Sequence, residues 1–406
     1  MSPHPKASLH LSRRLGFWLL SAYGIGTIVG AGIYVLVGEV IDHAGSTAPL
    51  SFILAGTLAV LTGLSYAEMS SRYPEAAGAA AYVGYGFEAP SFARLAGLTA
   101  AVVGIIGAAS IARGTAAYLG HFVDIPEAAS AGAVVALFAL VACLDVRQSA
   151  LAAAVHSAVE VAGLVIIIGI GAPTFVNLPE RLPSMIPTGL ASAGGTLAGA
   201  FIAFFAYAGF ETMVNMAEET RDPRRTMPRA IVIALAVAGI LYTLAVIAVL
   251  LSAPAGKLPA TTTPLALVIG RAGGDVSTLI AAIAVFATAN GVLVELMMVS
   301  RLLYGMARRG WAPRTFEQLW SPTKTPVRAT LVGGAAAIAL AVAVPIEPLA
   351  EATCTLLLAL FGTVNLALWR LHRRPGAAHA GFRAPSWVPP LGCVLSFAMI
   401  PAQFLA

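Results

Sequence analysis

The sequence predicts an all-α polytopic membrane protein with about eleven transmembrane helices. Of its 406 residues, 58% are hydrophobic and only 11% are charged, whereas a soluble domain carries roughly 25% charged residues. The apolar residues gather into long runs, and a run of roughly 20 is what a helix needs to cross the hydrocarbon core of a bilayer. The lipid bilayer is therefore the expected surroundings of most of the chain.

Eleven apolar runs, each bounded by charged residues or by Pro and Gly, mark the expected spans. They cover residues 15–40, 46–69, 91–119, 130–146, 150–172, 190–214, 229–252, 275–306, 327–345, 348–370 and 386–405. Residues 1–14 form an expected N-terminal tail. The first run is too long for the apolar part of a signal peptide and no small-residue cleavage site follows it, so it is expected to stay in the mature protein.

The basic residues predict which side of the membrane holds the N-terminus. Only Arg113, Arg181, Lys257 and Arg271, of 24 Lys and Arg residues, fall on the side opposite the N-terminus, which leaves 20 on the N-terminal side. Cytoplasmic loops carry an excess of basic residues. The N-terminus is therefore expected to be cytoplasmic, and an odd number of spans places the C-terminus outside.

The sequence gives no sign of nucleic-acid or metal binding. The formal net charge is +5, but the basic residues lie between apolar runs instead of gathering beside aromatic platforms. Cys143, Cys354 and Cys393 lie within apolar stretches without CxxC spacing, so neither a disulfide framework nor a metal site is indicated. No cofactor is expected.

Two classes of membrane function are not indicated by the sequence. The chain lacks the HExxH and GxSxG motifs, and its seven histidines are scattered, so an enzyme is not indicated. A channel would need a pore loop or rings of charge, which are not evident. A receptor that only senses its ligand would have the same sequence features as a carrier, and this alternative stays open.

Residues 24–34, GIGTIVGAGIY, place four glycines in the middle of the first apolar run. One interpretation is close helix packing, because Gly26 and Gly30 form a GxxxG pair. The other is a break in the helix, in which Gly30, Ala31 and Gly32 unwind and free backbone groups for a ligand. Glycine suits such a break because it tolerates irregular backbone and lets a ligand come close.

The sixth run offers a second break at the sequence AYAGFE, where Gly209 precedes the intramembrane acid Glu211. Spans one and six occupy corresponding places if the chain has two halves of five helices, residues 15–172 and 190–370. That is the arrangement of inverted-repeat transporters, in which half-helix N-termini face anionic groups and half-helix carbonyls face cations. Residues 386–406 then form a peripheral eleventh helix.

Several motifs in order along the chain resemble the amino acid-polyamine-organocation superfamily of secondary transporters. They are GTIVGAGIY in span one, YAEMSSRYPEAAGAAAYV at 66–83, FFAYAGFE and AEETRDPRRTMPRAI in span six and its loop, and VSRLLYGMARRGWAP at 299–313. The resemblance implies an inverted five-helix repeat bundle in the cytoplasmic membrane that moves an amino acid or organic amine by alternating access. Eleven spans depart from the family's usual twelve, which leaves the oligomeric state open.

By position, the resemblance also implies a substrate site made largely of backbone groups. The substrate carboxylate is expected at the amides of Gly30, Ala31, Gly32 and Ile33. The substrate ammonium is expected at the carbonyls of Ile28, Phe205, Ala206 and Ala208. A zwitterion needs donors at one end and acceptors at the other, and two broken helices supply both without a buried charged side chain. The Phe205 ring is expected to cover the substrate, and the small side chain of Ala108 to leave room for it.

Glu160 is the main candidate for ion coupling, because a charge at the centre of an apolar helix costs roughly 2.5 to 3.5 kcal/mol. By the same resemblance, it is expected to fill the position where proton-coupled relatives place a lysine against span-one carbonyls, here those of Gly26 and Val29. His156 lies four residues earlier, hence on the same helical face. A protonated Glu160 could donate to these carbonyls, which favours proton coupling.

Two alternatives to proton coupling remain at the sequence level. A sodium ion could bridge Glu160 and the span-one carbonyls with help from Thr288 and Asn290, or Glu160 could be a neutral structural group bonded to His156. Glu295 in span eight either faces the substrate, where it would favour a cationic side chain, or pairs with Arg113. The expected substrate is an amino acid, with polyamines as an alternative substrate and exchange as an alternative to symport.

Overall fold

The computed structural model describes residues 15–74, 78–143, 149–252, 268, 274–320, 325–374 and 381–405, and the predicted tail 1–14 lies outside them. Within these residues, seven helical stretches are long and apolar enough to cross a membrane, and the first runs from Phe17 to Arg72. Three shorter apolar helices cover Glu127–Ala142, Val327–Ala343 and Val388–Phe404. Together they coincide with all eleven predicted runs, so the predicted all-α polytopic fold is confirmed.

The helices follow the predicted spans closely. Spans one to five are formed by α1 (Phe17–Val29) with α2 (Ala31–Ala44), α3 (Ala48–Arg72), α5 (Pro90–Leu119), α6 (Glu127–Ala142) and α7 (Ser149–Gly171). Spans six to eleven are formed by α9 (Leu190–Ala203) with α10 (Phe210–Met213), α11 (Pro223–Ser252), α13 (Gly274–Arg308), α14 (Val327–Ala343), α15 (Ile346–His372) and α16 (Val388–Met399). The division into two inverted repeats stays a prediction.

Helical structure also occurs where the apolar runs did not indicate it. The segment after α3 contains α4 (Gly78–Phe87), which packs against α5 and α15. Between α7 and α9 the chain forms η2 (Ala172–Asn177), α8 (Leu178–Arg181) and η3 (Leu182–Met185). These pieces are too short to span a bilayer, which is why a search for long apolar runs passes over them.

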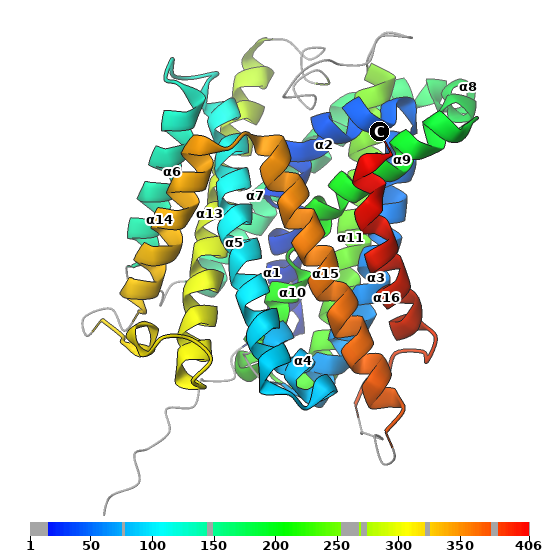
Figure 1. Ribbon diagram of the computed structural model, residues 1–406. Coiled ribbons are helices and arrows are strands. Elements are labelled where there is room, and N and C mark those ends of the chain that lie inside the picture. Colours follow the sequence, from blue (N-terminus) through cyan, green and yellow to red (C-terminus); the bar gives the residue numbers. More distant parts are fainter. Residues whose placement is uncertain are drawn as a thin grey trace, which may run out of the picture.

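The two interrupted helices lie in the middle of the bundle (Figure 1). Around them, α5 packs along α13, α11 packs along α3, and α1 contacts both α7 and α11. The pair α6 and α14 stands at one edge of the view in Figure 1, and α16, which packs on α15 and α3, stands at the other. The irregular backbone of both helices is thus enclosed by other helices on several sides, as a membrane requires of non-helical segments.

The first break is narrower than the sequence indicated. Gly30 alone leaves helical geometry, with φ −55° and ψ −131°, and α2 begins at the next residue. The prediction that Ala31 and Gly32 also unwind is therefore wrong, since both are helical. A single glycine suffices to redirect the chain because it has no side chain to restrict its backbone angles.

The second break is longer. After α9, residues Phe204–Tyr207 form the 3-10 turn η4, Ala208 is extended, and Gly209 has φ +123° before α10 begins. The chain then continues through a further 3-10 segment, η5 (Val214–Glu219). Span six is therefore irregular from Phe204 onward, which agrees with the predicted interruption at AYAGFE.

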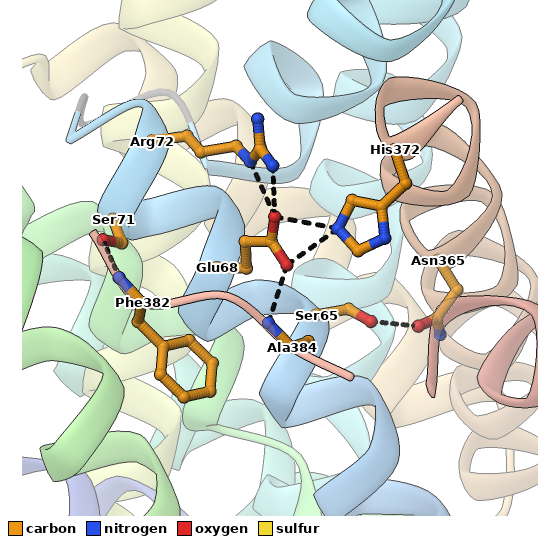
Figure 2. A network of polar contacts seen from close by, with 8 residues as sticks. All are labelled: Ser65, Glu68, Ser71, Arg72, Asn365, His372, Phe382 and Ala384. Carbon is orange, nitrogen blue, oxygen red and sulfur yellow. Dashed lines mark hydrogen bonds and ion pairs between the residues drawn. The ribbon is translucent and has the colours of Figure 1, made fainter. Parts of the chain in front are cut away.

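A buried polar network joins the end of α3 to α15 and to the segment before α16 (Figure 2). Glu68 is fully buried and accepts hydrogen bonds from Arg72 Nε at 2.7 Å, from His372 Nε2 at 2.9 Å and from the Ala384 N–H at 2.8 Å. One turn away, Ser65 donates to Asn365 at 2.6 Å. Three separate segments of the chain thus converge on one carboxylate.

We expect Gly209→Ala to destabilise the protein. Only glycine adopts a φ of +123° readily, and an alanine Cβ would also meet the Thr27 carbonyl of α1. The backbone penalty alone is about 1–3 kcal/mol. The apparent melting temperature in detergent should fall, whereas Gly189→Ala should leave it unchanged, because Gly189 is extended and has nothing within 4 Å of the added carbon. Equal melting temperatures would contradict the interpretation of Gly209.

Candidate functional site

The two helix breaks touch each other. A side-chain carbon on Gly32, in the first turn of α2, would collide with the backbone of Ala206 in η4, and one on Gly209 would collide with Thr27 at the end of α1. Thr27 also donates a hydrogen bond to the Gly209 carbonyl at 3.4 Å. We refer to this crossing of residues 27–33 with residues 204–209 as the junction. Residues 170 or more positions apart in the sequence meet here.

The first turn of α2 supplies hydrogen-bond donors at the junction. The N–H groups at the start of a helix have no intrahelical partner, and α2 begins at Ala31, so Ala31, Gly32 and Ile33 carry its first three N–H groups. The Gly30 N–H differs, because it donates to the Gly26 carbonyl at 3.1 Å. The expectation that the Gly30 amide is free is therefore wrong, while its three neighbours occupy the first turn of α2, where N–H groups have no partner within the helix.

The junction also contains backbone carbonyls, and a tyrosine hydroxyl contacts two of them. The Tyr242 hydroxyl of α11 is within hydrogen-bond distance of the Ile28 carbonyl and of the Ala206 carbonyl, the latter at 2.9 Å. One hydroxyl proton can serve only one of them at a time. The Phe205 carbonyl accepts the Ala208 N–H at 3.0 Å, which closes the turn. Tyr242 was not among the predicted site residues.

The side chains predicted beside the substrate are buried inside the bundle. Phe205 exposes 5% of its surface and Ala108 exposes none. A lipid-facing ring at position 205 is thereby excluded. Ala208 is partly accessible, and its carbonyl forms no hydrogen bond in the described part of the chain. The junction is therefore lined mainly by backbone and small or aromatic side chains.

Glu160 lies beside the first break, as predicted. It is 1% exposed, and its Oε1 atom and the Gly26 carbonyl oxygen both lie within 4 Å of the point that a side chain on Gly30 would occupy. Asn290 of α13 donates a hydrogen bond to the carboxyl group. The other carboxyl oxygen, Oε2, has no partner. The structure gives no hydrogen bond from Glu160 to Val29, and the side chain of His156 lies outside the described part.

Polar contacts around Glu160 tie three helices together. Tyr34 of α2 donates to the Glu160 backbone carbonyl at 2.9 Å, and Tyr118 of α5 donates to the Tyr34 carbonyl at 2.7 Å. Thr288 accepts from Thr115 of α5 at 2.9 Å and donates to its own helix. Thr288 is therefore engaged with α5, and its predicted association with Glu160 is not seen. The two tyrosines were missed, since apolar helices of this kind carry no stripe that shows which face is inward.

The intramembrane charges Glu295 and Arg113 do not pair with each other. Arg113 forms an ion pair with Glu127 at 3.3 Å and donates to the Val342 carbonyl at 3.0 Å. The alternative in which Arg113 neutralises Glu295 is therefore wrong. Glu295 instead faces α5, where a side chain on Gly107 would lie 3.6 Å from its carboxyl carbon.

Comparison with known proteins places this architecture among transporters. The family model described as amino acid permease matches residues 15–406. The chain is 32% identical to the vacuolar cationic amino acid transporter 4 of Arabidopsis thaliana over 365 residues, which are 84% of this chain and 60% of that protein. The chain thus spans less than two thirds of the length of this plant relative.

Two bacterial relatives are covered more completely. The methylthioribose transporter of Bacillus subtilis (strain 168) is 30% identical over 408 residues, with 93% of this chain and 85% of the relative covered. A branched-chain amino acid permease of the same organism is 27% identical, with 92% of this chain and 84% of the relative covered. The names of these three relatives refer to cationic amino acids, methylthioribose and branched-chain amino acids.

Proposed function

Since the chain belongs to the amino acid permease family, whose members are transporters and not enzymes, we propose that it is a secondary transporter of amino acids that works by alternating access. The observation that carries the proposal is the junction, where the first turn of α2 and the end of α1 contact the irregular backbone of span six. The names of two relatives, which refer to cationic and branched-chain amino acids, support the same substrate class.

The junction can bind both charged ends of an amino acid. The N–H groups of Ala31, Gly32 and Ile33, together with the positive end of the α2 dipole, suit a carboxylate. The carbonyls of Ile28, Ala206 and Ala208 suit an ammonium group. Tyr242 lies at the first two of these carbonyls, so an ammonium that enters would replace or share a contact that the tyrosine makes.

Alternating access follows from the same breaks. An interrupted helix can change the angle between its halves without losing hydrogen bonds inside either half, because the backbone leaves helical geometry at Gly30 and at Ala208–Gly209. The halves on each side of the junction can therefore open and close separately. The substrate site stays in the middle while access to it changes.

Glu160 is the residue that we assign to coupling. It is buried, it lies at the break itself, and one of its oxygens is unpartnered. Binding of a proton removes the repulsion between a carboxylate and the Gly26 carbonyl and allows a hydrogen bond, which would hold α7 to α1. Protonation and the position of the first broken helix are thereby linked. Sodium coupling is the competing mechanism, since Asn290 and backbone carbonyls supply oxygen ligands nearby.

The proposal includes a location and an orientation. The bacterial relatives and the apolar helices support a location in the cytoplasmic membrane. The surplus of basic residues on the N-terminal side supports a cytoplasmic N-terminus. On this orientation α2 and the start of α15 lie at the outer side, and α4 lies at the inner side.

Counterflow in proteoliposomes tests the proposed function. Vesicles preloaded with an unlabelled amino acid should take up the same labelled amino acid rapidly, and a panel of neutral and basic amino acids and polyamines should identify the best substrate. The predicted result is exchange that depends on the reconstituted protein. Specific binding without exchange would contradict transport and indicate a receptor, whereas exchange of polyamines alone would contradict the substrate class.

A further inference from the structure

Glu295 of α13 carries a carboxyl group that nothing in the described structure neutralises. Its Oε2 atom is enclosed and has no hydrogen-bond partner. The ion pairs in the described residues join other groups, and Arg113, the nearest candidate from the sequence, is bound to Glu127. Removing an unpaired charge from water is costly. A carboxyl group in this place is therefore expected to serve a ligand.

The part of α5 that Glu295 faces carries no polar side chain at the contacting positions. A side chain on Gly107 of α5 would lie 3.6 Å from the Glu295 carboxyl carbon, and one on Gly104 would lie 3.2 Å from Oε2. Ala108, beside Gly107, has the smallest side chain after glycine. The α5 helix therefore approaches the carboxyl group with backbone alone and offers it no polar partner of its own at these positions.

A second acid adds to the negative charge. Glu211, just beyond the second break, interacts electrostatically with Glu295. Its Oε2 atom accepts the Gly209 N–H at 2.8 Å, which fixes the side chain beside the junction. No Lys or Arg in the described ranges forms an ion pair with Glu211 either, since the pairs found there involve other acids. Two acids thus act on the same part of the interior without a compensating cation.

Two buried hydroxyls are also unsatisfied, one that interacts with Glu211 and one on the helix that Glu295 faces. Tyr66 of α3 is fully buried, interacts electrostatically with Glu211, and its hydroxyl has no hydrogen-bond partner. Ser110, one turn along α5 from Gly107, is likewise fully buried with an unpartnered hydroxyl. Buried polar atoms are normally hydrogen-bonded. The four side chains, which we call the acidic subsite, are Ser110, Tyr66, Glu211 and Glu295.

We infer that the acidic subsite binds the positively charged side-chain group of a basic amino acid, and that Glu295 is its main determinant. The inference rests on the proposed function and names the substrate class of the same site. The α13 helix packs against both α2 and α5, so Glu295 stands on an element that also borders the junction. With the backbone carboxylate and ammonium at the junction, a long side chain directed along α5 carries its cation to Glu295.

Lysine and norleucine provide the test, because they share a carbon skeleton and differ only in the terminal ammonium. In counterflow, the wild-type protein should prefer lysine. Glu295→Gln should weaken apparent lysine affinity by about 10- to 100-fold, the loss expected for a hydrogen bond to a charged group, and leave norleucine within a few-fold of its original affinity. Glu295→Asp, which keeps the charge, should recover part of the preference for lysine.

The controls separate this inference from the proposed function. Glu317→Gln neutralises an exposed acid on the turn Arg314–Glu317 and should change neither substrate. Wild-type protein that prefers norleucine would overturn the inference and leave amino acid transport intact. Protein that exchanges no amino acid would overturn the proposed function itself. If Glu295→Gln fails to fold, the substrate preference of the wild type and of Glu295→Asp still tests the inference. Equal losses of affinity for lysine and norleucine in either variant would overturn it.

Discussion

Glu160→Gln is expected to abolish accumulation of amino acid against a gradient while exchange across the membrane continues. The glutamine keeps the shape of a protonated carboxyl but cannot take up or release a proton. A pH difference of one unit corresponds to about 1.4 kcal/mol, so a symport of one proton supports about tenfold accumulation. The wild-type protein should approach that ratio without sodium, and the variant should only equalise the two sides.

Proteoliposomes with an imposed pH gradient measure this directly. Glu317→Gln is a matched control, because it removes an exposed acid far from the first break in the sequence and should leave accumulation unchanged. Accumulation that persists in folded Glu160→Gln protein would end the assignment of Glu160 to coupling. A wild-type requirement for sodium would replace proton coupling by sodium coupling and leave amino acid transport unaffected.

The second large effect is expected from Glu68→Ala, which removes the centre of the network in Figure 2. Arg72, His372 and the Ala384 N–H would all lose their acceptor. Loss of one partner from a buried ion pair costs about 3–5 kcal/mol, because the remaining charge stays buried without compensation. The apparent melting temperature in detergent should fall strongly, and the attachment of the segment before α16 to α3 should loosen.

Glu347→Ala is the control for this variant. Glu347 lies 4.0 Å from His43 and its side chain is 53% exposed, and exposed ion pairs contribute about 0–1 kcal/mol. Its melting temperature should match that of the wild type. A Glu68→Ala protein as stable as Glu347→Ala would show that the network does not hold α3, α15 and the loop together.

The spans were predictable because a bilayer imposes a simple rule on the sequence. A helix that crosses hydrocarbon needs a long apolar run, and each of the eleven runs coincides with helical structure. The two breaks were also visible, since glycines in mid-span mark where helical geometry can be left. Short helices such as α4 and α8 obey no such rule, because they lie outside long apolar runs and no length requirement identifies them.

The contacts of individual polar side chains were harder to predict. Position along a helix gives depth, so Glu160 and Glu295 were correctly placed inside the bundle. The direction in which each side chain points from its helix could not be predicted, because a helix that is apolar on all sides has no polar face that shows which side is inward. For this reason Thr288 was grouped with Glu160 although it contacts Thr115, and Tyr242 was missed although it reaches two broken helices.

The network of Glu68 shows a further limit. Glu68 and His372 are 304 positions apart, and nothing in the local sequence of either links them. Of these partners, only Arg72 could have been linked to Glu68 by helical spacing, since it lies four residues after Glu68. Partners that come from other helices become visible only when the packing is known.

A structure of the protein determined with its best amino acid bound tests the central claim most directly. The account predicts that the carboxylate lies within hydrogen-bond distance of the N–H groups of Ala31, Gly32 and Ile33, and that the ammonium lies at the carbonyls of Ile28, Ala206 or Ala208. An amino acid bound elsewhere in the bundle, with the first turn of α2 still unoccupied, would contradict the claim that the junction is the transport site.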